Sequence, residues 1–168
     1  MAMLIGVIAL GYSSIAGTDA KECASDLNTY LAETKTGTLG KDYQELKIYA
    51  DATTNEKKVD FVIYHYQADP ANPGDVLPDM TPEVIRTEAV GKSSVEITCN
   101  FSDSNPPIAI DSAGNSVTLA FNRASGAFEH AKIDDIQTTY DCVLITIQKG
   151  SRVYTIELIP TTGKHRIQ

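Results

Sequence analysis

The pattern of hydrophobic residues changes character along the first quarter of the chain. Residues 1–10 form an unbroken apolar run, and the first charged side chain is Asp19. Over residues 16–31 apolar positions recur at helical spacing, with charged and polar residues between them. No proline precedes Gly37, which provides a stop. The pattern therefore predicts one helix over residues 1–37, apolar all round in its first half and amphipathic in its second.

The two halves of this helix are expected to have different surroundings. We predict a membrane or filament-core part over about residues 1–17, an amphipathic part over 18–37, and a β-rich globular head over 38–168. The apolar run is shorter than the roughly 20 residues that cross a bilayer. The residues expected to face lipid or neighbouring helices are Met1, Leu4, Ile5, Val7, Ile8, Leu10 and Ile15. Those expected to pack on a sheet are Ala20, Cys23, Leu27 and Leu31.

Two other interpretations of the N-terminus remain open. A secretory signal peptide could end at the small-x-small triplet of residues 14–16, although no Lys or Arg precedes the apolar run. A helix buried in the core of a single domain is the second alternative.

From Tyr43 onward, short β-branched and aromatic runs alternate with turn residues, which is typical of strands. The clearest hairpin joins residues 142–148 to 152–159 through Lys149-Gly-Ser151. The predicted fold class is therefore α+β, with the long N-terminal helix packed on an antiparallel sheet or β-sandwich head.

Composition narrows the function. The 22 acidic and 14 basic residues give a net charge of −8, which does not suit binding to nucleic acid. Three cysteines are too few for a disulfide scaffold. Cys99 and Cys142 lie in strand-like runs, so two small buried side chains are favoured, and a disulfide between them is the alternative.

Candidate catalytic groups are few. The histidines are His65, His130 and His165, and a triad of Ser125, His130 and Asp134 lacks the sequence of a nucleophile elbow. We therefore predict that the chain is not an enzyme.

The best acidic cluster combines Asp134 and Asp135 with Asp141. Its spacing lacks the ligand order of an EF-hand. The expectation is no cofactor, with calcium a candidate that the spacing does not support.

Three segments of the chain resemble a known family. The apolar helix start, together with residues 117–126 and the final hairpin ending in Pro160-Thr-Thr-Gly-Lys164, resembles the type IV pilin superfamily and is most similar to minor pseudopilins of type II secretion systems. The basic leader, Gly-Phe processing site and following Glu of that family are missing, and we expect them to be encoded upstream.

The resemblance implies a structural subunit of a type IV pilus or a type II secretion-like filament. Its partners would be other pilin or pseudopilin subunits and the assembly platform in the bacterial cytoplasmic membrane, with a single pass and the head outside. A secreted β-sandwich binding or adhesin module, with residues 1–16 as signal peptide, is the alternative.

Overall fold

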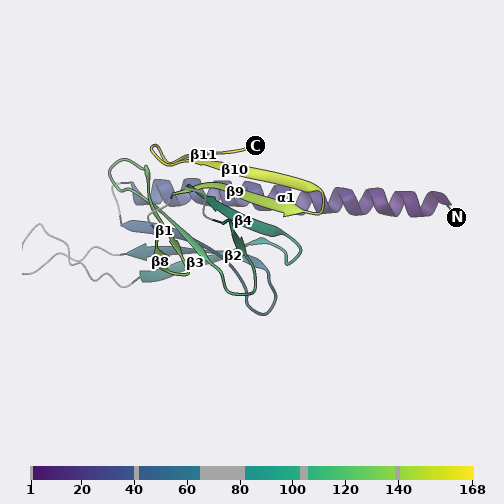
Figure 1. The fold of residues 1–168 in the computed structure, drawn as a ribbon, viewed down its shortest axis with the longest axis horizontal. Coiled ribbons are helices and arrows are strands. Elements are labelled where there is room, and N and C mark those ends of the chain that lie inside the picture. Colours follow the sequence, from purple (N-terminus) through teal and green to yellow (C-terminus); the bar gives the residue numbers. More distant parts are fainter. Residues whose placement is uncertain (1, 40–41, 65–81, 103–105, 139–140) are drawn as a thin grey trace, which may run out of the picture.

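The computed structural model describes residues 2–39, 42–64, 82–102, 106–138 and 141–168, with side chains from Asp19 onward. Within these ranges it contains one helix and eleven strands (Figure 1). They are α1 (Ala2–Thr38), β1 (Tyr43–Ala50), β2 (Lys57–Tyr64), β3 (Pro82–Gly91), β4 (Glu96–Phe101), β5 (Ile108–Ile110), β6 (Val117–Phe121), β7 (Phe128–Ile133), β8 (Ile136–Gln137), β9 (Cys142–Lys149), β10 (Arg152–Ile159) and β11 (Lys164–Ile167).

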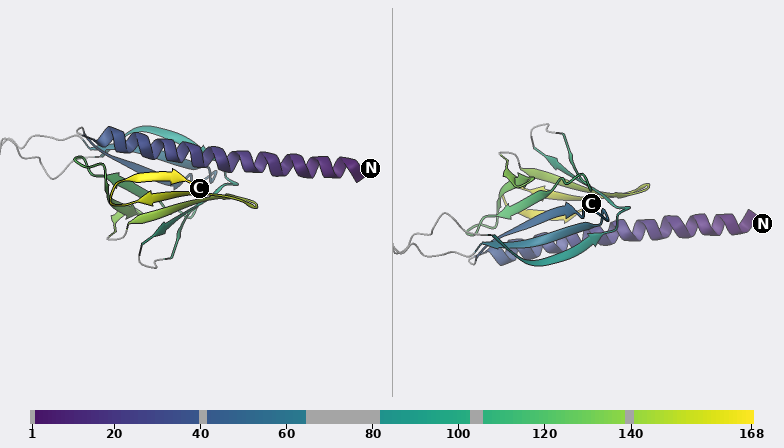
Figure 2. Two further views of the ribbon diagram at one scale, coloured as in Figure 1. Left: turned by 90° about the horizontal axis from the view of Figure 1, so that it is seen from above. Right: turned by 90° about the horizontal axis from the view of Figure 1, so that it is seen from below.

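The strands form two antiparallel sheets. The first has six strands in the order β3-β2-β1-β6-β7-β8, and the second has five in the order β11-β10-β9-β4-β5. Helix α1 contacts β1, β3 and β6 of the first sheet and β9, β10 and β11 of the second. Figure 2 shows α1 running alongside both sheets, so the helix and the second sheet together cover one face of the first.

Alternation along the strands defines an inner and an outer face of the six-stranded sheet. On β1, Leu46 and Ile48 point inward and are fully buried. Successive side chains of a strand point to opposite faces, so the odd-numbered residues of β1 point outward. The outer face therefore lies opposite the core, and it carries the polar residues described below.

Helix α1 joins the core from its middle onward. The side chains of one face, at a spacing of three and four residues, are 0% exposed, namely Ala20, Cys23, Ala24, Leu27 and Leu31. The ring of Tyr30 meets that of Phe61 on β2 edge to face, with centroids 5.4 Å apart. These contacts bind the described part of the helix to the sheets through hydrophobic burial.

Ion pairs fix α1 at the point where it enters the packed body. Asp19 pairs with Lys149, in the β9–β10 hairpin, and with Lys92, 3.2 Å away and directly after β3. Hydrogen bonds from Lys149 and then Lys92 lower the pKa of Asp19 against a smaller opposing effect of desolvation. One helical carboxylate thus links both sheets.

The opposite end is closed by two turns that pack backbone to backbone. Gly163, at φ 60°, lies so close to the carbonyl oxygen of Gly126 that a Cβ would clash with it. The Phe128 amide donates to the carbonyl of Pro160 at 2.9 Å, and the Lys35 ammonium of α1 donates to the carbonyl of Thr162 at 2.9 Å. Both sheets and the end of the helix therefore meet there.

The predicted fold class is wrong. The described body is mostly β, and only residues 19–38 of the helix are built into it, as one component of a two-sheet core. The prediction failed because it gave architectural weight to the apolar N-terminus, whereas the body is organised by pairing between strands far apart in the chain. Strand β1, for example, pairs with both β2 and β6.

Candidate functional site: a polar pocket on the outer face

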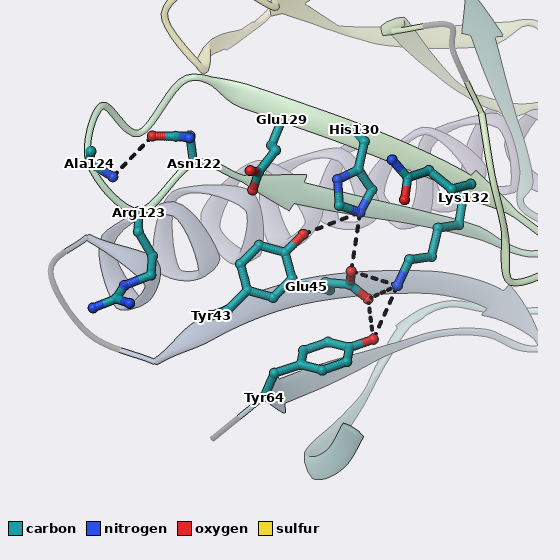
Figure 3. A pocket seen from close by; sticks show the side chains of 10 residues that line it. Tyr43, Glu45, Tyr64, Asn122, Arg123, Ala124, Glu129, His130 and Lys132 are labelled. Carbon is teal, nitrogen blue, oxygen red and sulfur yellow. Dashed lines mark hydrogen bonds and ion pairs between the residues drawn. The ribbon is translucent and has the colours of Figure 1, made fainter. Parts of the chain in front are cut away.

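A pocket of about 500 Å³ lies on the outer face of the six-stranded sheet (Figure 3). Its floor is formed by side chains of β1, β2 and β7, and its rim by the β6–β7 turn and β8. The lining residues are Tyr43, Glu45, Tyr64, Asn122, Arg123, Ala124, Glu129, His130, Lys132 and Gln137.

Small residues on β6 allow the floor to form. In the register of the sheet, Glu45 on β1 lies opposite Ala120 of β6, and Ala120 lies opposite His130 of β7. The short Ala120 side chain is fully buried. Long side chains from β1 and β7 therefore reach across β6 and meet above it.

Glu45 is the centre of this floor, and its residue is only 2% exposed. Its Oε2 atom accepts hydrogen bonds from the Tyr64 hydroxyl at 2.9 Å and the Lys132 ammonium at 2.8 Å. Its Oε1 atom lies 2.7 Å from the Lys132 ammonium and 3.4 Å from His130 Nε2. Within the described part of the chain, this Oε1 atom accepts no hydrogen bond of ordinary geometry. The carboxylate is thus held by charge and by two donors.

Burial and hydrogen bonding oppose one another at this carboxylate. Desolvation, the largest single effect, raises the pKa of Glu45, but His130, Lys132 and Tyr64 together outweigh it and hold that pKa below the ordinary value. For Lys132 the pKa is raised, because hydrogen bonds to Glu45 and Tyr64 exceed the effect of burial. Glu45 and Lys132 are therefore a stable charged pair at neutral pH.

The tyrosine hydroxyls of the pocket are tied to this pair. Tyr43 Oη lies 3.2 Å from His130 Nε2, and its ring packs 5.4 Å from that of Tyr64, centroid to centroid. Burial, followed by the charges of Glu45 and Glu129, raises the pKa of Tyr43 well above its ordinary range. Both phenols are therefore neutral, and their rings are fixed by the bonds of their hydroxyls.

The rim adds one basic side chain, one acidic side chain and neutral amides. Arg123 and Glu129 carry opposite charges, and Gln137 offers a neutral amide. Asn122 is occupied on one side, because its Oδ1 accepts from the amides of Ala124 and Ser125 at 3.0 and 3.1 Å. Apart from His130, two acidic and two basic residues line the pocket, so their formal charges cancel.

This arrangement offers a ligand both ring surfaces and hydrogen-bonding groups. The buried carboxylate of Glu45 is paired with Lys132 and also accepts a hydrogen bond from the Tyr64 hydroxyl. Among the described residues there is no group of three His, Cys, Asp or Glu side chains able to hold a metal ion. That the chain is not an enzyme remains a prediction.

The structure does not bring the hypothetical triad together. Ser125 Oγ bonds to Asn122 at 3.1 Å, His130 faces Tyr43 and Glu45, and Asp134 accepts from the backbone amide of Ser116 at 2.7 Å. His165 Nδ1 lies 3.3 Å from the Gly163 carbonyl oxygen, and His65 lies outside the described residues.

The acidic residues weighed for calcium have other partners. The Asp134 carboxylate accepts a hydrogen bond from the backbone amide of Ser116, and Asp135 forms an ion pair with Lys47 at 2.8 Å. The backbone of Asp141 bonds to Ser102, with the Ser102 amide donating to its carbonyl at 2.8 Å. The expectation of no cofactor is untested.

The cysteines are all buried free thiols. Cys99 and Cys142 lie on neighbouring strands β4 and β9, and no disulfide joins them. A hydrogen bond with Cys99, followed by burial, raises the pKa of Cys142, and burial raises that of Cys23 to about 12. The thiols therefore behave as small apolar side chains.

Of the residues predicted to act in assembly, the sheet-facing group lies in the core, as described above. The side chains of the apolar group, Met1, Leu4, Ile5, Val7, Ile8, Leu10 and Ile15, lie outside the described residues. Among the described residues, no helix combines the length with the apolar character needed to cross a membrane.

The pocket was not predicted from the sequence, although part of its signal is present there. Tyr43, Glu45, Lys47 and Tyr49 occupy alternate positions of one strand, which predicts a polar outer face. The partners Tyr64 and Lys132 come from elements 19 and 87 residues away from Glu45. A single sequence does not show such cross-strand neighbours.

No protein family, curated protein or solved structure matches the chain. The resemblance to type IV pilins and minor pseudopilins is therefore overturned: no family matches, and the described body is mostly β with two antiparallel sheets. Hydrophobic helix starts and β hairpins occur in many unrelated chains, so the three matched segments were too unspecific to show descent.

Proposed function

We propose that the chain is a structural subunit, not an enzyme, which joins other copies through its apolar N-terminal segment and displays its β body. The observation that carries this proposal is the direct continuity between residues 1–18, which contain no charged side chain, and a helix fixed in the core from Ala20 onward. An apolar run of this kind needs cover from lipid or from other apolar chains.

The firm attachment of that segment to the body supports a structural role. Asp19 is paired with Lys92 and Lys149 where the helix enters the body, and the buried helix face continues to Leu31. A force on the N-terminal segment would reach both sheets through these contacts. A loosely tethered head would need none of them.

Assembly can be tested with the full chain purified in detergent. After removal of the detergent, we expect large species by analytical ultracentrifugation. The double variant Leu4→Glu and Ile8→Glu is expected to stay monomeric, because a charge in an apolar interface is costly to desolvate. The control is Ser25→Glu with Thr29→Glu, which has the same spacing on the exposed helix face and should assemble like the parent chain.

Two results would contradict the proposal. One is a full chain that remains monomeric without detergent, and the other is equal assembly of the two double variants. A mature protein beginning at Gly17 would instead support the second candidate function, a secreted β-sandwich binding module, which the outward-facing pocket favours.

A further inference from the structure

The outer face of the six-stranded sheet carries three tyrosines whose hydroxyls are each bound to a neighbouring side chain. Tyr64 donates to Glu45, Tyr43 lies beside His130, and Tyr49 donates to Asp60 at 3.1 Å. A phenol held at its hydroxyl keeps its ring in one orientation and loses little entropy on contact with a ligand. The three rings are therefore preorganised.

The tyrosines mark out an extended surface. Tyr43 and Tyr64 are directly opposite on β1 and β2, whereas Tyr49 is six residues further along β1, about 20 Å away at the rise of a strand. A second, separate hollow of about 350 Å³, lined in part by Lys47, Tyr49 and Asp60, lies further along this face. The surface is long enough for a chain-like ligand.

The charges of the pocket disfavour an ionic ligand, whereas the second hollow carries Asp60, Asp134 and Asp135 beside Lys47. In the pocket, Glu45 is neutralised by Lys132, and Arg123 and Glu129 balance each other on the rim. The net charge of −8 repels anionic polymers. A cation would find Glu45 already occupied. What remains available in the pocket is the exposed part of the Tyr43 and Tyr64 rings, which also contact His130 and Lys132, beside amide, imidazole and carboxylate hydrogen-bonding groups.

We propose that this face binds a neutral saccharide chain, with the pocket between Tyr43 and Gln137 as its principal subsite. Sugar rings present apolar C–H faces and a perimeter of hydroxyls, and this surface offers fixed phenol rings beside planar polar side chains. Glu45 acts as a positioning residue that holds Tyr64, Lys132 and His130. The proposal does not depend on assembly through the N-terminus.

Binding is measured by titration calorimetry on the full chain in a detergent without a sugar head group. The probes are neutral hexasaccharides of β-1,4-glucose, α-1,4-glucose, β-1,4-mannose and β-1,4-N-acetylglucosamine, with a heparin hexasaccharide as the anionic comparison. We expect one or more neutral probes to bind with a Kd that changes less than about twofold between low and high salt.

Variants locate the site. Tyr43→Ala should weaken binding by about tenfold, the effect of losing roughly 1.4 kcal/mol of aromatic contact. Glu129→Ala, at an exposed rim position, tests the site without risk to the core and should weaken binding several-fold. Arg152→Ala, exposed on the second sheet, is the control and should leave the Kd unchanged.

Three outcomes would overturn the inference. They are no binding of any neutral probe at millimolar concentration, binding of heparin alone with steep salt dependence, and neutral binding that Tyr43→Ala and Glu129→Ala leave unchanged. If Tyr43→Ala does not fold, Glu129→Ala and Gln137→Ala decide the question.

Discussion

At the scale of single residues, the Glu45–Lys132 ion pair holds together the side chains at the floor of the pocket. Replacing Glu45 by Gln leaves the Lys132 ammonium without its counter-charge, in a side chain only 20% exposed. We expect Glu45→Gln to lower the free energy of unfolding by about 2 kcal/mol at pH 7, less than for a fully buried pair. Asp135→Asn, which breaks an exposed ion pair with Lys47, is the control and should cost below about 1 kcal/mol.

The same substitution has a predicted pH dependence. The folded pKa of Glu45 lies below its ordinary value of 4.5, so its carboxylate stabilises the fold fully above that pH. The stabilisation is lost as pH falls through the lower, folded pKa. Urea titrations of the parent chain and Glu45→Gln should therefore converge as pH drops below 4.5, and a constant difference would show that the charge of Glu45 is not responsible.

The number of free thiols among the three cysteines can be measured. With all thiols free and buried, a thiol reagent such as DTNB should react negligibly with the native chain and with three groups after unfolding in guanidinium without reductant. A count of one after unfolding would mean that a disulfide, such as Cys99–Cys142, had formed.

At the scale of elements, the β10–β11 turn depends on the absence of a side chain. Gly163→Ala would drive a Cβ into the Gly126 carbonyl oxygen as well as straining a positive φ, and we expect a loss of about 2–4 kcal/mol in urea unfolding. Gly150→Ala is the matched control, because Gly150 has φ 58° but open space around it. Its expected loss is about 1 kcal/mol. Equal losses would mean that the turn-to-turn contact contributes nothing.

Predictions from the sequence were most accurate at this scale, for the bounds of single strands and hairpins. The hairpin predicted at residues 142–148 and 152–159 lies within one residue of β9 and β10, since alternation and turn residues are local signals. Sheet membership is not local. The residues around Tyr43 do not indicate that β1 pairs with β6 rather than with β9. The burial of Glu45 depends on that pairing. The same limit explains why the fold class and the family resemblance were wrong.

At the scale of the whole molecule, α1 packs against both sheets, and we therefore expect them to unfold as one cooperative unit. Leu27 is 0% exposed within the shared core, so Leu27→Ala should cost about 2–5 kcal/mol and lower the midpoint for the entire body. Leu39→Ala, at a site 40% exposed, is the control and should cost much less. Melting followed by circular dichroism and by tyrosine fluorescence should give one coincident transition. Separate transitions would mean that the sheets unfold independently.

The position of α1 also sets an order of events during synthesis. The helix is made first, but β9, β10 and β11, which complete its surroundings, are among the last residues to be made. At ribosomal rates, the side chains of Ala20 to Leu31 wait on the order of ten seconds before their partners exist. A nascent chain of this design therefore exposes part of the apolar face of α1 until the last strands that cover it have been made. Early contact with a membrane or a chaperone would protect it during that interval.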